Sequence, residues 1–331
     1  MRSRPPSIAV QVLIAGRMPA ILVLLVVAAT LFTGGQFLQL DNLVNVMRQV
    51  SLEALIGFGM TFVIVIGGID LSVGSVVALT GVVAALTMQA CPNASPALRV
   101  GAGFISALLV GAAAGGFSGA IISRFAIPPF IVTLVAMLMA RGAAFILCDG
   151  RPVYELPMEL MWWGRGFVFE DVWGRRLPTM VLVMFAGYGI FLVLFARTVF
   201  GRSVVAVGSN EQAAYLAGIR VRTTKLAVYV LTGVLCGLAG LLQDAKLMAG
   251  DPKVGEMWEL NVIAAVVVGG TSLFGGRGTV TGTLIGALII GVLNNSLNLL
   301  HVEHFWQKVV LGLVILAASL LDAGLRRLED H

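Results

Sequence analysis

Long apolar runs separated by short polar loops dominate this sequence. Ten such runs recur along the chain, most of them close to the roughly 20 residues that a helix needs to cross a bilayer. Because lipid offers the backbone no hydrogen-bond partner, each run is predicted to form a helix. No segment has the alternating ten-residue pattern of a transmembrane β-strand. The runs lie at about 18–38, 50–68, 73–91, 99–122, 129–148, 178–196, 226–247, 258–270, 279–299 and 305–322, of which the eighth is short for a full crossing.

The composition predicts an all-α integral membrane protein with one transmembrane domain over residues 1–331. Hydrophobic residues make up 58% of the chain and charged residues 12%, with a mean hydropathy of +0.97, whereas soluble domains carry about 25% charged residues. The net charge of +5 comes from cations spread over short loops, which argues against nucleic-acid binding. The three cysteines are interpreted as small buried hydrophobes, although a pairing of Cys91 with Cys148 stays open.

The charges of two long loops predict the orientation of the chain. Segment 197–225 has five basic residues against Glu211 alone, whereas segment 149–177 has four basic and five acidic residues. Since basic loops stay in the cytoplasm, 197–225 is expected inside and 149–177 outside. Ten helices then place both termini in the cytoplasm, and the basic start of the chain followed by run 18–38 reads as a retained first helix.

The stretch "VIVIGGIDLSVGSVVALTG" (residues 63–81) looks like a span that stops halfway. Gly67, Gly68 and Gly74 permit a break in the helix, and Asp70 with Ser72 supplies polar groups there. A carboxylate in mid-bilayer costs about 2.5–3.5 kcal/mol, so Asp70 is expected to face protein or water. It is predicted to cap the half-helix that follows, with a direct contact to substrate as the alternative.

The same spacing of glycines recurs near the C-terminus. Gly67-Gly68-x-x-Leu71-x-x-Gly74 is echoed by Gly269-Gly270-x-x-Leu273-x-x-Gly276, so a second break is predicted over 269–278. Paired interrupted segments in the two halves of a membrane protein point to a substrate path. Chance is the alternative in a chain with 40 glycines.

A short capped helix is predicted in the basic loop 197–225. Ser209 followed by Gln212 has the spacing of a capping box, Glu211 suits the first turn, and Gly218 suits a left-handed stop. About two turns are too short to be stable alone, so this helix is expected to need a partner. The alternative is that it rests on the bundle or on the membrane surface.

Four motifs in order, "GGIDLSVGS", "IPPFIVTLVAMLMARG" running into "GRPV", "AVGSNEQAAYLAGI" and "GVLNNSLNLL", carry a family resemblance. From about residue 40 to 322 the chain resembles the permease of ATP-binding-cassette importers of the ribose, arabinose, xylose and galactoside type. The resemblance implies a homodimeric, multi-pass permease that imports a monosaccharide and lies in the lipid of the bacterial inner membrane. Its implied partners are a cytoplasmic ATPase subunit and a periplasmic sugar-binding protein. The matching coupling element, which seats in the ATPase, comprises Ser209, Asn210, Glu211, Gln212, Ala213, Ala214, Leu216, Ala217 and Gly218.

The chain is not expected to be an enzyme or to bind a cofactor. It has no G-x-x-x-x-G-K-[ST] phosphate loop, and "GGTSLFGGRGT" lacks the required lysine. ATP and magnesium are therefore expected on the partner ATPase. His301 and His304 flank Glu303, but without a third placed ligand no metal site is predicted.

Polar residues in two runs are candidates for the substrate path. Asparagine amides donate and accept hydrogen bonds, which suits a neutral polyol, although helix packing is an alternative use. Arg141 is expected either to reach the outer interface or to donate to sugar or a carboxylate. The candidates are Asn294, Asn295, Asn298, Phe130, Thr133 and Arg141.

Two other classes of membrane protein are weighed against this interpretation. An ion-coupled secondary transporter would need titratable groups deep in the spans. Glu53, Asp70 and Asp244 are the candidates, and positions close to the membrane interfaces are open to all three. An integral-membrane enzyme would need paired acids or a Ser/His/Asp set on one face, and only three histidines are present.

Overall fold

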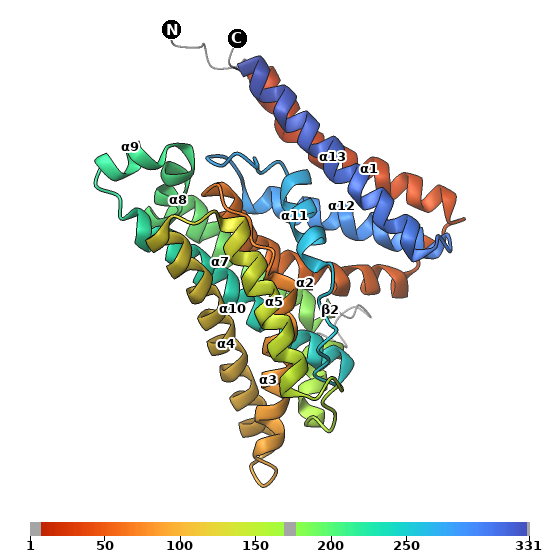
Figure 1. Cartoon of the computed structure of the whole chain (residues 1–331). Helices are drawn as coiled ribbons and strands as arrows, with labels where there is room; N and C mark the ends of the chain where they lie inside the picture. The colour runs from red at the N-terminus through yellow and green to blue at the C-terminus, as the bar shows by residue number, and fades with distance from the viewer. Residues whose placement is uncertain (1–7, 169–176, 330–331) are drawn as a thin grey trace.

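The computed structural model describes residues 8–168 and 177–329, and these residues are mostly helical (Figure 1). Two short antiparallel strands, β1 (Phe167–Val168) and β2 (Leu177–Pro178), and two 3-10 turns, η1 (Gln36–Leu38) and η2 (Met158–Leu160), complete the described part. The helices are α1 (Ile8–Phe32), α2 (Leu40–Val65), α3 (Val73–Ala90), α4 (Pro96–Phe125), α5 (Pro129–Leu147), α6 (Met161–Arg165), α7 (Thr179–Arg197), α8 (Val199–Ser209), α9 (Glu211–Leu216), α10 (Val221–Leu247), α11 (Trp258–Val268), α12 (Val280–Leu299) and α13 (His304–Glu329).

Each of the ten predicted runs coincides with one helix. Within the described residues, seven helices are long and apolar enough to cross a membrane, namely α2, α3, α4, α5, α7, α10 and α12. The apolar parts of α1, α11 and α13 are shorter. The prediction of an all-α, multi-pass membrane protein is confirmed, whereas crossing by the three shorter helices remains a prediction.

Two segments differ from the sequence-based expectation. Helix α2 begins at Leu40, nearly three turns before run 50–68. The added turns carry polar residues with protein partners: the Arg48 guanidinium donates to the Arg165 carbonyl at 2.9 Å. The segment after α7 was expected as loop and instead forms α8. The Thr198 hydroxyl caps α8 by accepting from Gly201 N–H at 3.2 Å, and Val204 and Val207 are buried on its inner face.

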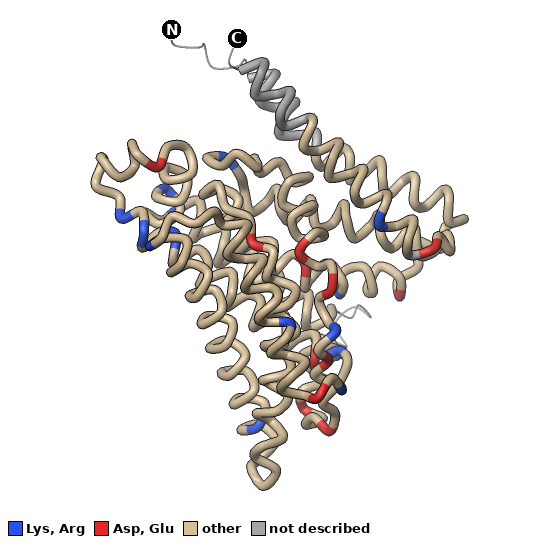
Figure 2. The backbone as a smooth tube through the Cα atoms, in the orientation of Figure 1, with Lys and Arg blue, Asp and Glu red and all other residues tan. Residues whose placement is uncertain are grey.

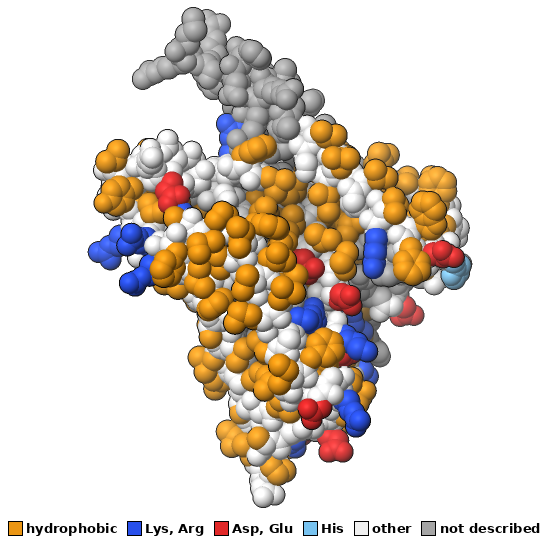
Figure 3. Space-filling model, viewed as in Figure 1, with side chains coloured by type: hydrophobic (Ala, Val, Ile, Leu, Met, Phe, Trp, Pro, Cys, Tyr) orange, Lys and Arg blue, Asp and Glu red, His pale blue; other side chains and the backbone are white. Residues whose placement is uncertain are grey.

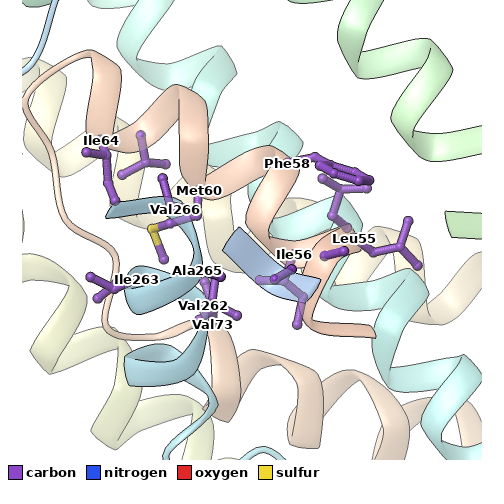
Figure 4. Packing of buried hydrophobic residues seen from close by; sticks show 14 of the residues in the cluster. Leu55, Ile56, Phe58, Met60, Ile64, Val73, Val262, Ile263, Ala265 and Val266 are labelled. Carbon is purple, nitrogen blue, oxygen red and sulfur yellow. The ribbon is translucent and has the colours of Figure 1, made fainter. Parts of the chain in front are cut away.

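Helix α2 is the centre of the bundle. In its most apolar window 89% of the residues are buried, against 28% in α5 and α7. Figure 4 shows side chains of α2 such as Ile56 and Met60 packed beside Val262 and Val266 of α11. The peripheral helices leave apolar side chains exposed, and Figure 3 shows these gathered over one broad face. An exposed apolar periphery around a packed centre fits a lipid environment.

Helices α4 and α10 approach each other through glycines. A Cβ atom added at Gly111 or Gly115 of α4 would overlap a backbone carbonyl oxygen of α10, and one added at Gly233 or Gly237 would overlap a carbonyl of α4. Small residues at every fourth position allow such close contact between membrane helices. Ordinary side chains at these positions would separate the two helices.

The described ends of the chain share one end of the molecule. Figure 1 shows the start of α1 and the end of α13 toward the same end as α8 and α9, with the turn between α3 and α4 at the opposite tip. In Figure 2, Lys and Arg gather near α8 and α9, whereas charges of both signs mix around α6. This arrangement agrees with the loop-charge argument, and the side of the membrane that each end faces remains a prediction.

Candidate substrate path and coupling segment

Both predicted breaks end a helix with the same kind of turn. After α2, Gly67 adopts a left-handed conformation (φ 78°), and Gly68 N–H donates to the Val63 carbonyl at 2.8 Å. After α11, Gly270 is left-handed (φ 91°), and the next N–H donates to the carbonyl five positions earlier at 3.1 Å. Both are Schellman motifs, which favour glycine at the left-handed position. The left-handed residue is the first glycine of one pair and the second of the other, so the sequence echo is offset by one residue in space.

Asp70 lies inside the first break and is 3% exposed. One carboxylate oxygen accepts from both the backbone N–H and the hydroxyl of Ser72, at 2.9 and 2.6 Å. Ser72 is the residue before α3. The backbone of Gly74 packs on Gly255, where a Cβ atom would overlap a carbonyl oxygen. The carboxylate therefore satisfies polar groups at the start of α3 and does not face lipid.

The two breaks touch each other. Gly276 N–H, in the link between α11 and α12, donates to the Val65 carbonyl at the end of α2 at 2.8 Å. The repeated glycine motifs, about 200 residues apart in the sequence, thus form one polar junction of backbone groups inside an otherwise apolar bundle.

The short helix in the basic loop is α9, and the predicted capping box is wrong. Ser209 is the last residue of α8, and its hydroxyl donates to the Val205 carbonyl at 2.8 Å. Asn210 is the cap, because its side-chain oxygen accepts from Ala213 N–H at 2.9 Å. The cap lies one residue after the predicted position, because α8 extends through Ser209. Gln212 therefore does not complete a capping box with Ser209. Gly218 ends the turn in the expected left-handed conformation (φ 84°).

The apolar residues of the coupling element, Ala213, Ala214, Leu216 and Ala217, do not all lie on the exposed surface of this segment. Ala214 is buried against the rest of the chain, whereas Tyr215 and Leu216 are 72% and 84% exposed. Ala213 and Ala217 are also exposed. Ala214 is therefore not available for contact with a partner, although the resemblance includes it in the coupling element. Tyr215 and Leu216 are thus the large apolar side chains that this short helix exposes.

An open groove of about 1110 Å³ runs beside α9. Glu211 of α9 forms an ion pair with Lys225 of α10 at 2.8 Å, which fixes one wall of the groove. The other charged side chains along it are arginines, so the groove is basic. Its lining includes Ser123, Arg124, Gln212, Tyr215, Leu216, Arg220, Arg222 and Lys225.

The asparagine cluster of α12 is mostly engaged within the chain. The side chains of Asn295 and Asn42 exchange two hydrogen bonds, at 2.9 and 2.8 Å. Asn298 accepts from the Gln307 amide at 2.8 Å. Asn294 is half-buried, and its side chain makes no hydrogen bond among the described residues. Of the three predicted asparagines, Asn294 has both amide groups free among the described residues, whereas Asn298 uses its oxygen alone and Asn295 uses both groups.

Sequence reasoning missed a row of polar pairs that α2 makes with α11 and α12. Besides Asn42 with Asn295, the Glu53 carboxylate accepts from the Asn261 amide at 3.1 Å, and the hydroxyls of Thr61 and Thr283 lie 2.6 Å apart. The second carboxylate oxygen of Glu53 is buried without a partner in the described part of the chain. Isolated polar residues on a buried face, at the spacing of one helix side, were the available signal.

Glu53 and Asp244, two further acids within the apolar helices, are both buried in the chain. Glu53 is 3% exposed and sits midway along α2, 12 positions before its last residue Val65. Asp244 is 2% exposed near the end of α10.

The predicted residues of α5 lie apart from one another. Phe130, at the start of α5, is 52% exposed. Thr133 is fully buried, and its hydroxyl lies within hydrogen-bond distance of the Pro129 carbonyl at 3.0 Å and of the Ile69 carbonyl in the first break at 3.2 Å. The Arg141 guanidinium donates to the carbonyls of Pro252 and Val254 at 2.6 and 2.7 Å, joining α5 to the link between α10 and α11. The structure does not bring these three side chains together with Asn294.

Among the residues whose side chains the structure describes, no group of three His, Cys, Asp or Glu is arranged to hold a metal ion. The side chain of His304 lies outside these residues.

Known proteins are similar to this chain over the region that contains both helix breaks, α9 and the asparagines of α12. A family model described as "Branched-chain amino acid transport system / permease component" matches residues 42–319. The chain is 42% identical to the ribose import permease protein RbsC of Escherichia coli K12, over 92% of this chain and 91% of that protein. It is 38% identical to the L-arabinose permease AraH of Azospirillum brasilense (91% and 86%) and 32% identical to the xylose permease XylH of Escherichia coli K12 (93% and 92%). No solved structure matches.

Proposed function

The chain belongs to this family of transport-system permease components, and from that premise we propose that it carries a monosaccharide through the membrane for an ATP-binding-cassette importer. It is a transport subunit and not an enzyme, and ATP is hydrolysed by a separate subunit. The observation that carries this proposal is the similarity to sugar permeases over more than nine tenths of the chain.

A five-carbon sugar of the ribose type is the first substrate to test. The ribose permeases of three organisms are 41–42% identical to this chain, whereas the allose permease AlsC is 37% and the xylose permease 32% identical. These are differences of degree between neutral polyols. They support the class of substrate more firmly than they separate one sugar from another.

The partner ATPase docks on the end of the molecule that carries α9. Tyr215 and Leu216 supply exposed apolar contact area, and the basic groove beside them supplies electrostatic complementarity to an acidic surface. Because α9 has only six residues, it depends on neighbours for stability. The ion pair with Lys225 and the buried Ala214 hold it in place before the partner arrives.

Sugar passes along the polar side of α2, α11 and α12. Asn294 has its whole amide left for a sugar hydroxyl, while the bonds of Asn295 with Asn42 and of Asn298 with Gln307 hold the chain around it. Asp70 and the glycines around it hold the break open at the inner end, and Arg141 fixes the link after α10 at the outer end. A weakly binding path suits transport, since the sugar must also leave.

The remaining parts of the assembly follow from the same function. A second copy of the chain completes the permease, and a periplasmic sugar-binding protein delivers substrate to the end with the turn between α3 and α4 and with α6. This places the chain in the inner membrane, with the α9 end in the cytoplasm. Alternating access then arises when ATP-driven closure of the ATPase subunits moves α9 at both copies.

Stimulated ATP hydrolysis tests the proposal. The chain is purified in detergent with its co-expressed ATPase, and hydrolysis is measured with the binding protein loaded with ribose, loaded with allose, or empty. We expect sugar-loaded binding protein to raise the rate above the empty form. Equal rates with loaded and empty binding protein, in a complex shown to be assembled, would contradict the proposal.

A further inference from the structure

Three segments that are distant in the sequence meet through their backbones beside α8. These are the end of α2 at Val65, the end of α8 at Gly208 and Ser209, and the link after α11 at Gly275 and Gly276. One hydrogen bond joins two of them, from Gly276 N–H to the Val65 carbonyl at 2.8 Å. We call these five residues the glycine junction.

The glycine junction leaves no room for a side chain. A Cβ atom at Gly208 would overlap the Val65 carbonyl oxygen and lie 2.8 Å from Gly276 N. A Cβ atom at Gly275 would lie 2.9 Å from the Gly208 carbonyl oxygen and 3.1 Å from that of Val65. Backbone in such contact is stiff, because no rotamer change can absorb a displacement. A shift of α8 must therefore move the end of α2 and the second break.

The junction is linked directly to α9. Only Asn210 separates α8 from α9, and it belongs to both, since its backbone N–H donates to the Ala206 carbonyl of α8 at 3.1 Å while its side chain caps α9. A single shared residue leaves no flexible linker between the two helices. A force applied to the exposed side of α9 reaches Gly208 within the same rigid unit.

On its other side the junction borders the polar row along α2. Thr61, one helical turn before Val65, shares its hydroxyl hydrogen bond with Thr283 of α12 at 2.6 Å. A Cβ atom at Gly278 would lie 2.7 Å from a Val65 methyl group, so the start of α12 is also in contact. Motion of the junction thus acts on the inner ends of α2, α11 and α12 together.

From these contacts we infer that Gly208 and its glycine partners Gly275 and Gly276 are positioning residues that transmit the movement of α9 to the two helix breaks. The inference rests on the proposed function. It adds that coupling depends on the glycine junction as well as on the α9 surface where the ATPase docks. A side chain at Gly208 separates the three segments. The ATPase then still binds and hydrolyses ATP, but the movement of α9 no longer displaces the two helix breaks.

The test uses the complete importer in proteoliposomes and measures sugar uptake and ATP hydrolysis in the same preparation. We expect Gly208→Ala to lower the sugar transported per ATP hydrolysed by about tenfold, within the usual range of coupling between sites. Co-purification of the ATPase is expected to stay at the wild-type level. The matched control is Gly189→Ala, because a Cβ atom there meets nothing within 4 Å, and its ratio is expected to equal that of the wild type.

A second variant leaves the glycine packing untouched. One glycine inserted after Asn210 makes the connection of α8 and α9 flexible, and it is expected to lower the same ratio even where Gly208→Ala fails to fold. A wild-type ratio in either folded variant overturns the inference. Absence of ATP-driven uptake in the wild-type importer would instead remove the proposed function, and this inference with it.

Discussion

The side chains of Asn42 and Asn295 donate to each other, Nδ2 to Oδ1, at 2.9 and 2.8 Å across 253 residues of sequence. This reciprocal amide pair joins the first turn of α2 to α12. Both hydrogen-bonding groups of Asn295 are thereby used within the chain, whereas the neighbouring Asn294 makes no such bond in the described part of the molecule. Two adjacent asparagines consequently have different roles.

Substituting these two neighbours separates stability from transport. Asn295→Leu removes the donor to Asn42 Oδ1, while Asn42 Nδ2 keeps its bond to the Phe37 carbonyl at 2.9 Å. We expect the variant to destabilise the bundle by about 1 kcal/mol, as for other amide bonds between membrane helices. Asn294→Leu is expected to leave the unfolding temperature in detergent unchanged and to lower ATP-driven uptake about tenfold, the effect of roughly 1.4 kcal/mol.

Thermal unfolding and uptake of both variants provide the check. The double variant Asn42→Leu with Asn295→Leu serves as the control, because it removes both amides of the pair. Only part of the lost stability is expected to return, since the Phe37 carbonyl then loses its bond from Asn42. Normal uptake by Asn294→Leu would remove that residue from the path.

The α9 surface gives a prediction about docking. Leu216 is 84% exposed, so Leu216→Asp is expected to leave the permease folded and to reduce the amount of ATPase that co-purifies, because a carboxylate is poorly solvated in a packed interface. Leu98→Asp, at the far end of the molecule and 64% exposed, is the control with unchanged ATPase. Ala214→Glu is expected to lower stability as well, since Ala214 is buried within the chain. Full ATPase binding by Leu216→Asp would show that α9 is not the dock.

An exposed native cysteine reports the sidedness of the fold. Cys91 lies exposed at the turn between α3 and α4, opposite α9, while Cys236 is buried. We expect an impermeant thiol reagent to label Cys91 from outside the cell. In a Cys91→Ser background, Ser209→Cys is expected to react only in inverted vesicles. Labelling of both positions from the same side would contradict the proposed orientation.

The sequence located the helices well because each apolar run satisfies its own backbone, and glycines with Asp70 marked where a run stops. It could not locate what depends on packing between distant segments. The bond from Gly276 to Val65 and the amide pair of Asn42 with Asn295 join parts of the chain that no local pattern relates. The cap of α9 was misplaced by one residue for a local reason, because α8 had not been expected and it ends at Ser209.

Glu53 distinguishes an ATP-driven importer from an ion-coupled transporter. It is the buried acid midway along α2, bonded to Asn261. Glu53→Gln keeps the size of the side chain and an oxygen that accepts from Asn261 but removes the ability to bind and release a proton. We expect ATP-driven uptake by Glu53→Gln to stay within about twofold of wild type, because the residue serves to join α2 to α11. Loss of uptake with normal folding and ATPase binding would indicate an ion-coupled step.

The energy source of uptake tests the central claim most directly. Proteoliposomes containing the permease and its ATPase, with the ribose-loaded binding protein on the side opposite the ATPase, are supplied either with ATP or with a proton or sodium gradient and no ATP. The account predicts that labelled ribose crosses the membrane only with ATP, and that no ribose crosses in vesicles that lack the ATPase. Uptake driven by an ion gradient alone, in vesicles that hold the permease and no ATPase, would contradict it.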